Sequence, residues 1–495
     1  MILRDIARLQ PAVRLVGDPT VPILGVTADS RLVKPGWLFV AIPGLVVDGH
    51  NYATQAVKNG AGAILAERPL PVDIPQAIVS ATQPLLGHVA AMFHEYPSEK
   101  LRVVGITGTK GKTSTSYLLD HLCISAGLHA SFVGSVGGRV AGVQLEAGLT
   151  TRAAEDLQML ICKAVQANET HWIMEVGSHS LTQRRVAGIA FDTAIFTNFS
   201  RDHLDYHGTM ESYLEAKMLL FSWLGSASGL GNKRQKVAIL NYDDPVTETL
   251  RLHCGVPVLT YGLSTEANLW ADNITLGSHN SSFVVHWQGQ SELVQLPLVG
   301  RFNVYNTLAA LAGGLVEQLD FEDMVAALAS FPGIPGRFQR VDEGQPFTVV
   351  VDYAHTEDSL RQVLGAAREM TSKRIIVVCG CTGDRDRGKR PMMGKLACSH
   401  ADWVVFTSDD PHSESPESII DEMVAILPSN VTNWQREADR TTAVGIALGL
   451  AKPGDLVLLA GKGHEAIQVF DGYSVPYSDV ETAVAVLRDL GYAPL

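Results

Sequence analysis

A glycine-rich segment with two lysines is the part of the chain whose residue types point most directly to chemistry. Residues 101–106, Leu-Arg-Val-Val-Gly-Ile, are typical of a strand, and Thr107-Gly-Thr-Lys-Gly-Lys-Thr-Ser114 follows them. Apolar residues then recur with helical spacing between positions 119 and 126. A strand, a glycine-rich turn, Gly-Lys-Thr and a helix together predict a P-loop that binds the phosphates of a nucleotide.

Each part of this loop has a chemical role. The glycines let backbone N–H groups approach the phosphates, and the start of the helix adds its positive dipole. We expect Lys112 to reach the β- and γ-phosphates and Thr113 to hold Mg²⁺. The spacing is G-x-x-G-T-x-G-K-T, since the first glycine of the general motif would fall on Ile106. The predicted ATP contacts in the loop are Gly108, Thr109, Lys110, Gly111, Lys112, Thr113 and Ser114.

Carboxylate and imidazole groups follow two further strand-like runs. Residues 172–174 end at Glu175, and residues 194–196 lead to Asp202 and His203. Such groups beside a P-loop favour a divalent cation that bridges the nucleotide and a second substrate. A zinc site is a weaker interpretation, because the cluster lacks a convincing set of four ligands.

Lys217 lies at the centre of an apolar helix face. If residues 211–221 form a helix, its neighbours one turn away are Tyr213, Leu214, Leu220 and Phe221. Burial would lower the pKa of the lysine and leave a nucleophilic amine that CO₂ could convert into a carbamate. Alternatively, the ammonium group reaches the edge of the face and stays in solvent. The pattern alone leaves both interpretations open.

Polar clusters follow several β-rich runs in the last third of the chain. The runs are 348–351, 375–379, 403–406, 456–459 and, most weakly, 474–477. The first four lead into polar segments 352–355, 380–387, 409–412 and 461–465. Because ligands bind at the carboxyl ends of strands in open parallel sheets, we expect these four clusters to form one site.

Several motifs give the chain a specific resemblance to a known family. It resembles the ATP-dependent Mur ligases at Gly105-Ile-Thr-Gly-Thr-Lys-Gly-Lys-Thr113, Glu175-Val-Gly-Ser-His179, Asp202-His-Leu-Asp-Tyr-His-Gly208 and Leu298-Val-Gly-Arg-Phe-Asn-Val-Tyr-Asn306. Four later segments narrow the resemblance to the branch that adds the third peptide residue of the cell-wall precursor: Gly333-Ile-Pro-Gly-Arg337, Asp352-Tyr-Ala-His-Thr356, Gly383-Asp-Arg-Asp-Arg-Gly-Lys-Arg-Pro391 and Gly461-Lys-Gly-His-Glu465. Asp29-Ser-Arg31 and Asp48-Gly-His50 are similar to the uridine-binding domain of that branch.

The resemblance implies an ATP-dependent C–N ligase of peptidoglycan synthesis that forms ADP and phosphate. ATP would phosphorylate the D-glutamate carboxylate of UDP-N-acetylmuramoyl-L-alanyl-D-glutamate. The amine of a diamino acid would then attack the acyl phosphate. Such chemistry requires mainly positioning and charge neutralisation, which a P-loop, Mg²⁺ and basic side chains supply.

The resemblance also implies roles for single residues. The catalytic residues would be Lys112, Lys217, His203 and His355, and the metal ligands Thr113, Glu175, His203 and carbamylated Lys217. Asn303, Asn306 and Arg337 would contact ATP in addition to the P-loop. The UDP-sugar-dipeptide would contact Ser30, Thr150, Thr151, Gln183 and Arg185.

The implied amino-acid pocket matches the family less well. It comprises Arg385, Asp409, Asp410, Pro411, His412, Gly461 and Glu465. Enzymes for meso-diaminopimelate carry Asp-Asn-Pro-Arg where this chain has Asp-Asp-Pro-His, and a neutral histidine cannot replace the bidentate arginine–carboxylate pair. We therefore expect L-lysine or L-ornithine as the substrate, with meso-diaminopimelate as the alternative.

Other departures affect single contacts: Lys110, Arg152, Gly177 and Glu357 replace residues usual in the family.

Competing interpretations are a folylpolyglutamate-synthetase-like ligase, a non-catalytic nucleotide-binding relative and a P-loop switch or motor. A test with UDP-sugar-peptide against folate separates the first from a Mur ligase. Lack of ATP turnover with every substrate would favour the second.

Length and composition set the architecture around these residues. A chain of 495 residues corresponds to about three domains. We expect three α/β domains: a mixed uridine-binding domain over 1–98, a central P-loop domain with a parallel sheet over 99–332, and a doubly wound C-terminal domain over 333–495. The Ser/Gly-rich residues 225–232 are expected to form a surface loop within the central domain.

Charge and composition exclude several classes of protein. The net charge of −13 argues against a protein that binds nucleic acid over its whole surface. The six cysteines show no disulfide-framework spacing. The first residues lack a signal-peptide profile, and no apolar stretch is long enough to span a membrane. We therefore expect a cytoplasmic monomer.

Overall fold

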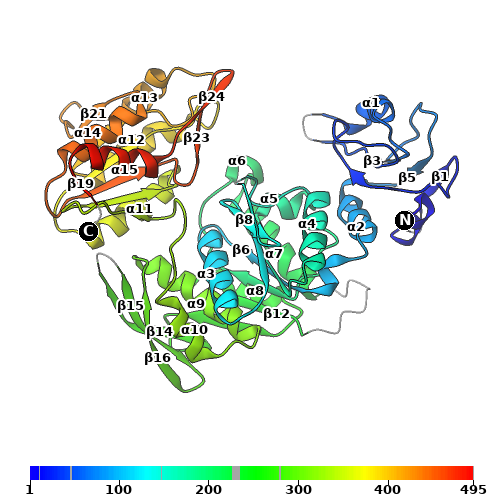
Figure 1. Cartoon of the computed structure of the whole chain (residues 1–495), viewed down its shortest axis with the longest axis horizontal. Helices are drawn as coiled ribbons and strands as arrows, with labels where there is room; N and C mark the ends of the chain where they lie inside the picture. The colour runs from blue at the N-terminus through cyan, green and yellow to red at the C-terminus, as the bar shows by residue number, and fades with distance from the viewer. Residues whose placement is uncertain (11, 45–46, 147, 226–234, 278–279, 494–495) are drawn as a thin grey trace. The chain divides into compact units, whose positions relative to one another are not determined.

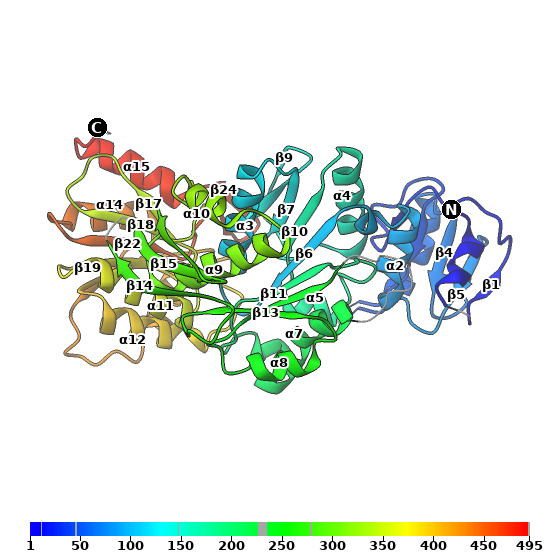
Figure 2. The ribbon, with the colours of Figure 1, turned by 90° about the horizontal axis from the view of Figure 1, so that it is seen from below.

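The computed structural model describes residues 1–10, 12–44, 47–146, 148–225, 235–277 and 280–493. Most of the predicted loop over 225–232 therefore lies outside the described residues. The chain forms two compact units (Figures 1 and 2). The first comprises Met1–Trp270 with Tyr305–Met324, and the second comprises Ala271–Val304 with Val325–Leu495.

The first unit begins with a small mixed sheet in the order β1-β5-β4-β3-β2. Only β1 runs antiparallel to its neighbour, and the other pairs are parallel. Apolar side chains are buried on both faces of the sheet because its strands are short and almost entirely apolar. The strands are β1 (Arg14–Val16), β2 (Val26–Thr27), β3 (Leu38–Val40), β4 (Ala63–Ala66) and β5 (Gln76–Ile78), with helices α1 (Ala53–Lys58) and α2 (Gln83–Phe93).

A larger parallel sheet in the first unit positions the predicted P-loop. Its parallel strands run in the order β14-β13-β12-β11-β6-β10-β7, with β14 (Leu269–Leu276) paired to β13 through Leu269 and Trp270. The others are β6 (Arg102–Thr107), β7 (Ala130–Gly134), β10 (His171–Glu175), β11 (Thr193–Phe196), β12 (Val237–Asn241) and β13 (Val258–Gly262). β8 (Gly137–Val140) and β9 (Val143–Leu145) extend one edge in antiparallel fashion.

Helices cover both faces of this sheet, which explains why its strands are apolar throughout. On one face, α4 (Ala154–Gln166) and α7 (Met210–Gly225) pack against the strands. On the other face, α3 (Lys112–Ser125) approaches α9 (Arg301–Val316), where Gly313 leaves room for Leu119 and Ile195. The structure thus confirms the predicted strands over 101–106, 172–174 and 194–196 and the helix over 211–221.

A second parallel sheet is the core of the second unit, in the order β17-β18-β22-β19-β20-β21. Only β17 is antiparallel to its neighbour. The strands are β17 (Gln339–Val341), β18 (Thr348–Asp352), β19 (Ile375–Cys379), β20 (Trp403–Phe406), β21 (Trp434–Arg436) and β22 (Leu456–Ala460). β15 (Ser281–Trp287) and β16 (Gln290–Leu296) form an antiparallel hairpin in the same unit.

Helices also cover both faces of this sheet, so the unit is doubly wound as predicted. One face carries α11 (Glu357–Met370), α12 (Lys389–His400) and α13 (Pro416–Val424). The other carries α14 (Arg440–Leu450) and α15 (Asp479–Asp489). The weakest predicted run, 474–477, does not join the sheet, because β24 (Tyr473–Pro476) pairs only with β23 (Ile467–Phe470) in a hairpin.

The expected fold class of α/β domains built on parallel sheets is therefore confirmed. The domain boundaries at 98 and 332 stay predictions. Within the described residues, no helix combines the length and the apolar character that crossing a membrane requires.

A buried carboxylate anchors the chain just after α9, beneath the amino ends of the first unit's strands. Glu317 accepts hydrogen bonds from Arg102 Nε at 2.7 Å and from Thr193 Oγ1 at 3.2 Å, and it lies 3.3 Å from His171 Nε2. Burial alone would raise the pKa of Glu317, but hydrogen bonds from His171 and Arg102 outweigh it and lower the pKa to about 2. The carboxylate is therefore ionised at neutral pH and stabilises the fold.

We predict that Glu317→Gln lowers the free energy of unfolding at pH 7 by about 2 kcal/mol, because it removes the ionised carboxylate that contacts Arg102 and His171 and leaves Arg102 with the more distant Asp192 carboxylate at 3.6 Å. The stabilisation is complete above the unfolded pKa of 4.5 and is lost as pH falls toward 2. Calorimetry should therefore show the difference between wild type and variant shrinking below pH 4.5. The exposed Glu322→Gln is the control, and equal effects of both variants would contradict the prediction.

Candidate active site

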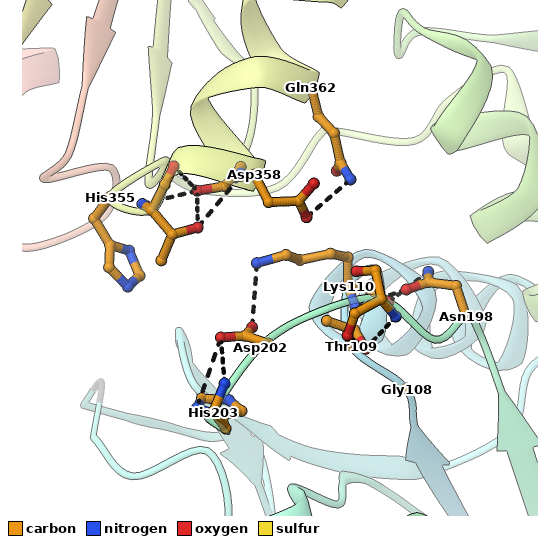
Figure 3. Close-up of polar contacts among 12 residues, drawn as sticks. Gly108, Thr109, Lys110, Asn198, Asp202, His203, His355, Asp358 and Gln362 are labelled. Carbon is orange, nitrogen blue, oxygen red and sulfur yellow. Dashed lines mark hydrogen bonds and ion pairs between the residues drawn. The ribbon is translucent and has the colours of Figure 1, made fainter. Parts of the chain in front are cut away.

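The glycine-rich loop connects β6 to α3 and is fixed by polar groups that follow β11 (Figure 3). Asn198 accepts the Thr109 N–H at 2.8 Å through its carbonyl and the Lys110 N–H at 2.9 Å through Oδ1. Asn198 Nδ2 and Thr197 Oγ1 donate to the Lys110 carbonyl at 3.0 and 2.6 Å. Gly108 has a φ of +147°, and a Cβ there would lie 1.9 Å from Thr197 Oγ1. The loop conformation thus depends on glycine and on its neighbouring strand.

Lys217 projects from α7 into the core under this loop. It is 1% exposed, its Nζ donates to the Gly108 carbonyl at 2.7 Å, and Nζ lies 4.5 Å from the centre of the Tyr213 ring. The interpretation that its ammonium group stays in solvent is therefore wrong. Burial, together with the nearby Lys112 charge, holds the pKa of Lys217 well below its usual range. A neutral amine at this position is chemically accessible at neutral pH.

Two more lysines belong to the loop itself. Lys112 Nζ donates to the carbonyls of Gly108 and Thr109, each at 2.9 Å. Lys110 Nζ points to Asp202 at 3.3 Å, as Figure 3 shows. Lys110 is therefore paired with a carboxylate close to the loop, and it is partly buried. The loop concentrates positive charge where nucleotide phosphates would bind.

Oxygen donors suited to Mg²⁺ gather beside the start of α3. Thr113 Oγ1 lies 3.1 Å from Ser135 Oγ, and the Ser135 N–H donates to Glu175 Oε1 at 3.1 Å. Glu175 is 1% exposed. Carboxylate and hydroxyl oxygens are what Mg²⁺ prefers, so Thr113 and Glu175 fit the predicted ion. Ser135, which links them, was not among the predicted residues, since no motif marks it.

His203 belongs to a separate group of aromatic rings. It directly precedes α6 (Leu204–His207), and its ring packs edge-on against His179 with centroids 4.7 Å apart. Burial lowers the pKa of His203, which favours the neutral imidazole that a metal ligand needs. Within the described ranges, no cluster of three potential metal-binding side chains includes both His203 and Glu175. The structure thus assembles the predicted magnesium ligands only in part.

The residues predicted to bind the UDP-sugar-dipeptide also make mutual contacts. Thr151 Oγ1 donates to the Glu175 carbonyl at 3.0 Å. Arg185 donates to the Thr151 carbonyl at 3.1 Å and to Gln183 Oε1 at 2.6 Å. Thr150 is half-buried next to this group. Ser30 lies in the small N-terminal domain region, where its carbonyl accepts a hydrogen bond from Asn59.

The remaining predicted ATP contacts are divided between the units. Asn306 belongs to the first unit, and a Cβ on Gly111 would lie 2.3 Å from its Oδ1. Asn303 belongs to the second unit, where Nδ2 donates to the Val299 carbonyl at 2.9 Å. Arg337 stacks over the Tyr353 ring at 4.8 Å, and His355 Nδ1 lies 2.8 Å from the Tyr353 carbonyl.

The four polar clusters of the second unit do converge at the carboxyl ends of β18, β22, β19 and β20. Lys462 is fully buried, and its Nζ lies 2.8 Å from Asp410, 2.6 Å from Glu465 and 3.9 Å from Asp409. Tyr353 OH donates to Glu465 Oε1 at 3.2 Å. Three carboxylates thus face one ammonium group, and the excess of negative charge can attract a cationic ligand group. Sequence reasoning did not assign Lys462 a role, although it lies within the Gly461–Glu465 motif.

The other predicted pocket residues lie on the same neighbouring loops. The Gly383 N–H donates to the Asp410 carbonyl at 2.7 Å, which joins the loop of Arg385 to that of His412. Arg385 is exposed, whereas His412 is half-buried and its N–H donates to the Val469 carbonyl. Pro411 packs against Gly383, and Gly461, with a φ of +120°, lies against Asp409. The loops that carry the seven predicted pocket residues are therefore joined by hydrogen bonds, ion pairs and close packing, and the Arg385 guanidinium donates to the Asp384 carbonyl at 3.4 Å.

Three family models match the chain in succession. The Mur ligase family catalytic domain matches residues 22–101, the Mur ligase middle domain matches 106–314, and the Mur ligase glutamate ligase domain matches 336–463. Together they cover the small N-terminal sheet except β1, the P-loop sheet except the first residues of β6, and the doubly wound sheet. The P-loop and most of the strand-end loops of the second unit fall within matched regions, and Glu465 lies two residues beyond the last one.

Similar proteins give the same result over the whole chain. A Bacillus cereus protein named UDP-N-acetylmuramoyl-L-alanyl-D-glutamate–2,6-diaminopimelate ligase is 42% identical, with 94% of this chain and 95% of that protein covered. A Listeria monocytogenes protein of the same name is 39% identical over 100% of both chains. A solved structure with this name has a TM-score of 0.70 and 30% identity, again over 100% of both.

A more distant solved structure shares the fold. The MurF ligase of Thermotoga maritima in complex with ADP has a TM-score of 0.64 at 19% identity, and the comparison covers 94% of this chain and 97% of that one. The three matching domains and the relatives that align with nearly all of the sequence point to one conclusion. The chain belongs to the Mur ligase family of ATP-dependent ligases.

Proposed function

We propose that this enzyme joins meso-diaminopimelate to the D-glutamate carboxylate of UDP-N-acetylmuramoyl-L-alanyl-D-glutamate, with formation of ADP and phosphate. The observation that supports the proposal is the group of charged side chains at the strand ends of the second unit. There, Asp410 and Glu465 offer negative charge and Arg385 offers an exposed guanidinium on the adjoining loop. These are complementary to the ammonium and carboxylate groups at one end of a diaminodicarboxylic acid.

The expectation of L-lysine or L-ornithine is not supported. It rested on His412, which occupies the place of an arginine in the family. The relatives aligned with the whole chain are named 2,6-diaminopimelate ligases. We propose Arg385 as the physical reason, because its exposed guanidinium belongs to a loop that is hydrogen-bonded to the loop of His412, and a guanidinium can form the bidentate carboxylate pair that His412 cannot.

In the proposed reaction the chain mainly positions charged groups. Backbone N–H groups of the P-loop and Lys112 bind the phosphates of ATP, and the D-glutamate carboxylate attacks the γ-phosphorus with loss of ADP. Mg²⁺, for which Thr113 and Glu175 fit as ligands, would neutralise phosphate charge when bound. The diamino acid's amine attacks the acyl carbon and loses a proton, and phosphate leaves.

We also propose that Lys217 reacts with CO₂ to form a carbamate. Its buried amine has a lowered pKa, as nucleophilic attack on CO₂ requires. The neutral amine adds to the carbon of CO₂ and releases a proton, which leaves an anionic carbamate near Lys112 and the Lys110–Asp202 pair. The Lys112 charge would stabilise this carbamate, whereas it repels the ammonium form of Lys217.

Lys217→Met should remove the carbamate and lower kcat at least about 100-fold, since a charged group under the phosphates is lost. Labelling with ¹³C-bicarbonate should give a carbamate ¹³C signal in the wild type and none in this variant. The exposed Lys163→Met, on α4, should keep both signal and activity. A wild-type protein without the signal would contradict the carbamate, and an active Lys217→Met would contradict its role.

The substrate is tested by phosphate release from ATP with Mg²⁺ and UDP-N-acetylmuramoyl-L-alanyl-D-glutamate. Meso-diaminopimelate, L-lysine and L-ornithine are supplied one at a time, and product masses are measured. We predict that kcat/KM for diaminopimelate exceeds that for the other two at least about 100-fold, because they lack the second carboxylate. Preference for lysine or ornithine would contradict the proposed substrate. Turnover only with folate would favour the folylpolyglutamate-type ligase, and no turnover would favour a non-catalytic relative.

We infer that the enzyme acts in the cytoplasm, because ATP, the UDP-linked precursor and a free amino acid meet there. We also propose that it acts as a monomer.

A further inference from the structure

One carboxylate joins the two loops that carry Arg385 and His412. Glu414 accepts the Asp384 N–H at 2.7 Å and hydrogen bonds from Arg387 at 2.7 Å and Arg390 at 2.8 and 2.9 Å. The Arg390 hydrogen bond and the Asp384 N–H lower the pKa of Glu414 to about 2, so the carboxylate is ionised at neutral pH. Its four hydrogen bonds all come from residues 384–390.

The anchor of this carboxylate is a buried guanidinium on α12. The Arg390 side chain is 0% exposed, and its Nη2 also donates to the Thr382 carbonyl at 3.3 Å. A buried arginine has few alternative positions and needs its charged partner, so it holds Glu414 in one place. Glu414 in turn fixes the backbone at Asp384, one residue before Arg385.

The two loops also make direct contacts on the pocket side of Glu414. Ser413 Oγ donates to Asp384 Oδ1 at 2.7 Å, and the Gly383 N–H donates to the Asp410 carbonyl at 2.7 Å. Asp384 and His412 both have left-handed backbone conformations, with φ of 53° and 49°. Residues other than glycine are uncommon in this region, although Asp and His enter it more readily than most, so surrounding contacts help to hold them there. The contacts around Glu414 supply that restraint on both loops.

We propose that Glu414 is a positioning residue for the amino-acid substrate: it holds the Arg385 loop against the loop of Asp409, Asp410 and His412. The substrate would contact those residues and not Glu414. This inference rests on the proposed function, because it concerns the pocket of the same reaction. Its consequence is selective. Loss of the Glu414 charge should weaken binding of the diamino acid and leave ATP and the UDP-linked substrate unaffected.

A matched control lies on α13. Glu422 accepts a hydrogen bond from Arg390 at 2.8 Å and lies 3.5 Å from Arg387, so it neutralises the same two guanidinium groups. In the part of the chain that the structure describes, no hydrogen bond joins Glu422 to residues 383–386 or 409–413. Glu414→Gln and Glu422→Gln therefore remove equal charge from one ion cluster, but only the first loosens the two pocket loops.

The experiment measures kcat and the KM of each of the three substrates for wild type, Glu414→Gln and Glu422→Gln, and the melting temperature of each protein. We expect Glu414→Gln to raise the KM of the diamino acid about tenfold or more, with the other two KM values within about twofold of wild type. Glu422→Gln should leave all three KM values within about twofold. Similar losses of melting temperature in both variants would not change this contrast.

A second variant applies if Glu414→Gln does not fold. Ser413→Ala removes one hydrogen bond between the exposed parts of the loops, and we expect it to raise the KM of the diamino acid about threefold without affecting the other substrates. Equal changes of all three KM values in Glu414→Gln, an unchanged KM for the diamino acid, or the same selective change in Glu422→Gln would overturn the inference. The wild-type assay decides the proposed substrate separately, and the variants are then compared with whichever diamino acid the wild type uses.

Discussion

The Lys217 amine donates a hydrogen bond to the Gly108 carbonyl from inside the core of the first unit. A lysine without a charged partner is unstable as an ammonium ion at such a depth. Burial next to this hydrogen bond and the Tyr213 ring therefore favours the neutral form of Lys217. The same contact fixes the first glycine of the phosphate loop. Asn198 and Thr197 fix the next residues from the adjacent strand. Lys217, Asn198 and Thr197 thus fix the conformation in which the loop can bind phosphates.

The second unit gathers negative charge at its site, whereas the phosphate loop of the first unit gathers positive charge. Its pocket gathers three carboxylates around the buried Lys462, and this ion cluster lies where four parallel strands end. Arg390 and Glu414 form a second buried ion pair just outside it. Each buried charge is paired and occupies a fixed place, so the loops between them can present Arg385 and Glu465 to a substrate. Buried polar groups therefore organise the phosphate loop, and buried ion pairs organise the amino-acid pocket.

The polar residues that follow the buried strands were predictable, because each group lies next to its strand in the sequence and forms a recognisable local pattern. The run 102–107 with its glycines, and the four polar clusters after buried strands in the last third, were found where the sequence predicts them. The partners Ser135, Lys462 and Glu414 were not identified, since their roles arise from tertiary contacts between segments distant in sequence. The choice between buried and solvent-facing Lys217 likewise needed the packing of α7. The interpretation based on His412 pointed to the less favoured substrate, because the sequence did not show that the loop of Arg385 is hydrogen-bonded to the loop of His412.

The most direct test follows an oxygen atom from the substrate carboxylate to the released phosphate. It shows whether the phosphate loop serves to activate a carboxylate. The UDP-linked substrate is prepared with ¹⁸O in the D-glutamate side-chain carboxylate, and the released phosphate is analysed by mass spectrometry after a single turnover with ATP and the diamino acid. Attack of the carboxylate on the γ-phosphorus, followed by amide formation, predicts one ¹⁸O atom in each phosphate. Phosphate without ¹⁸O, released together with the amide product, would contradict the account.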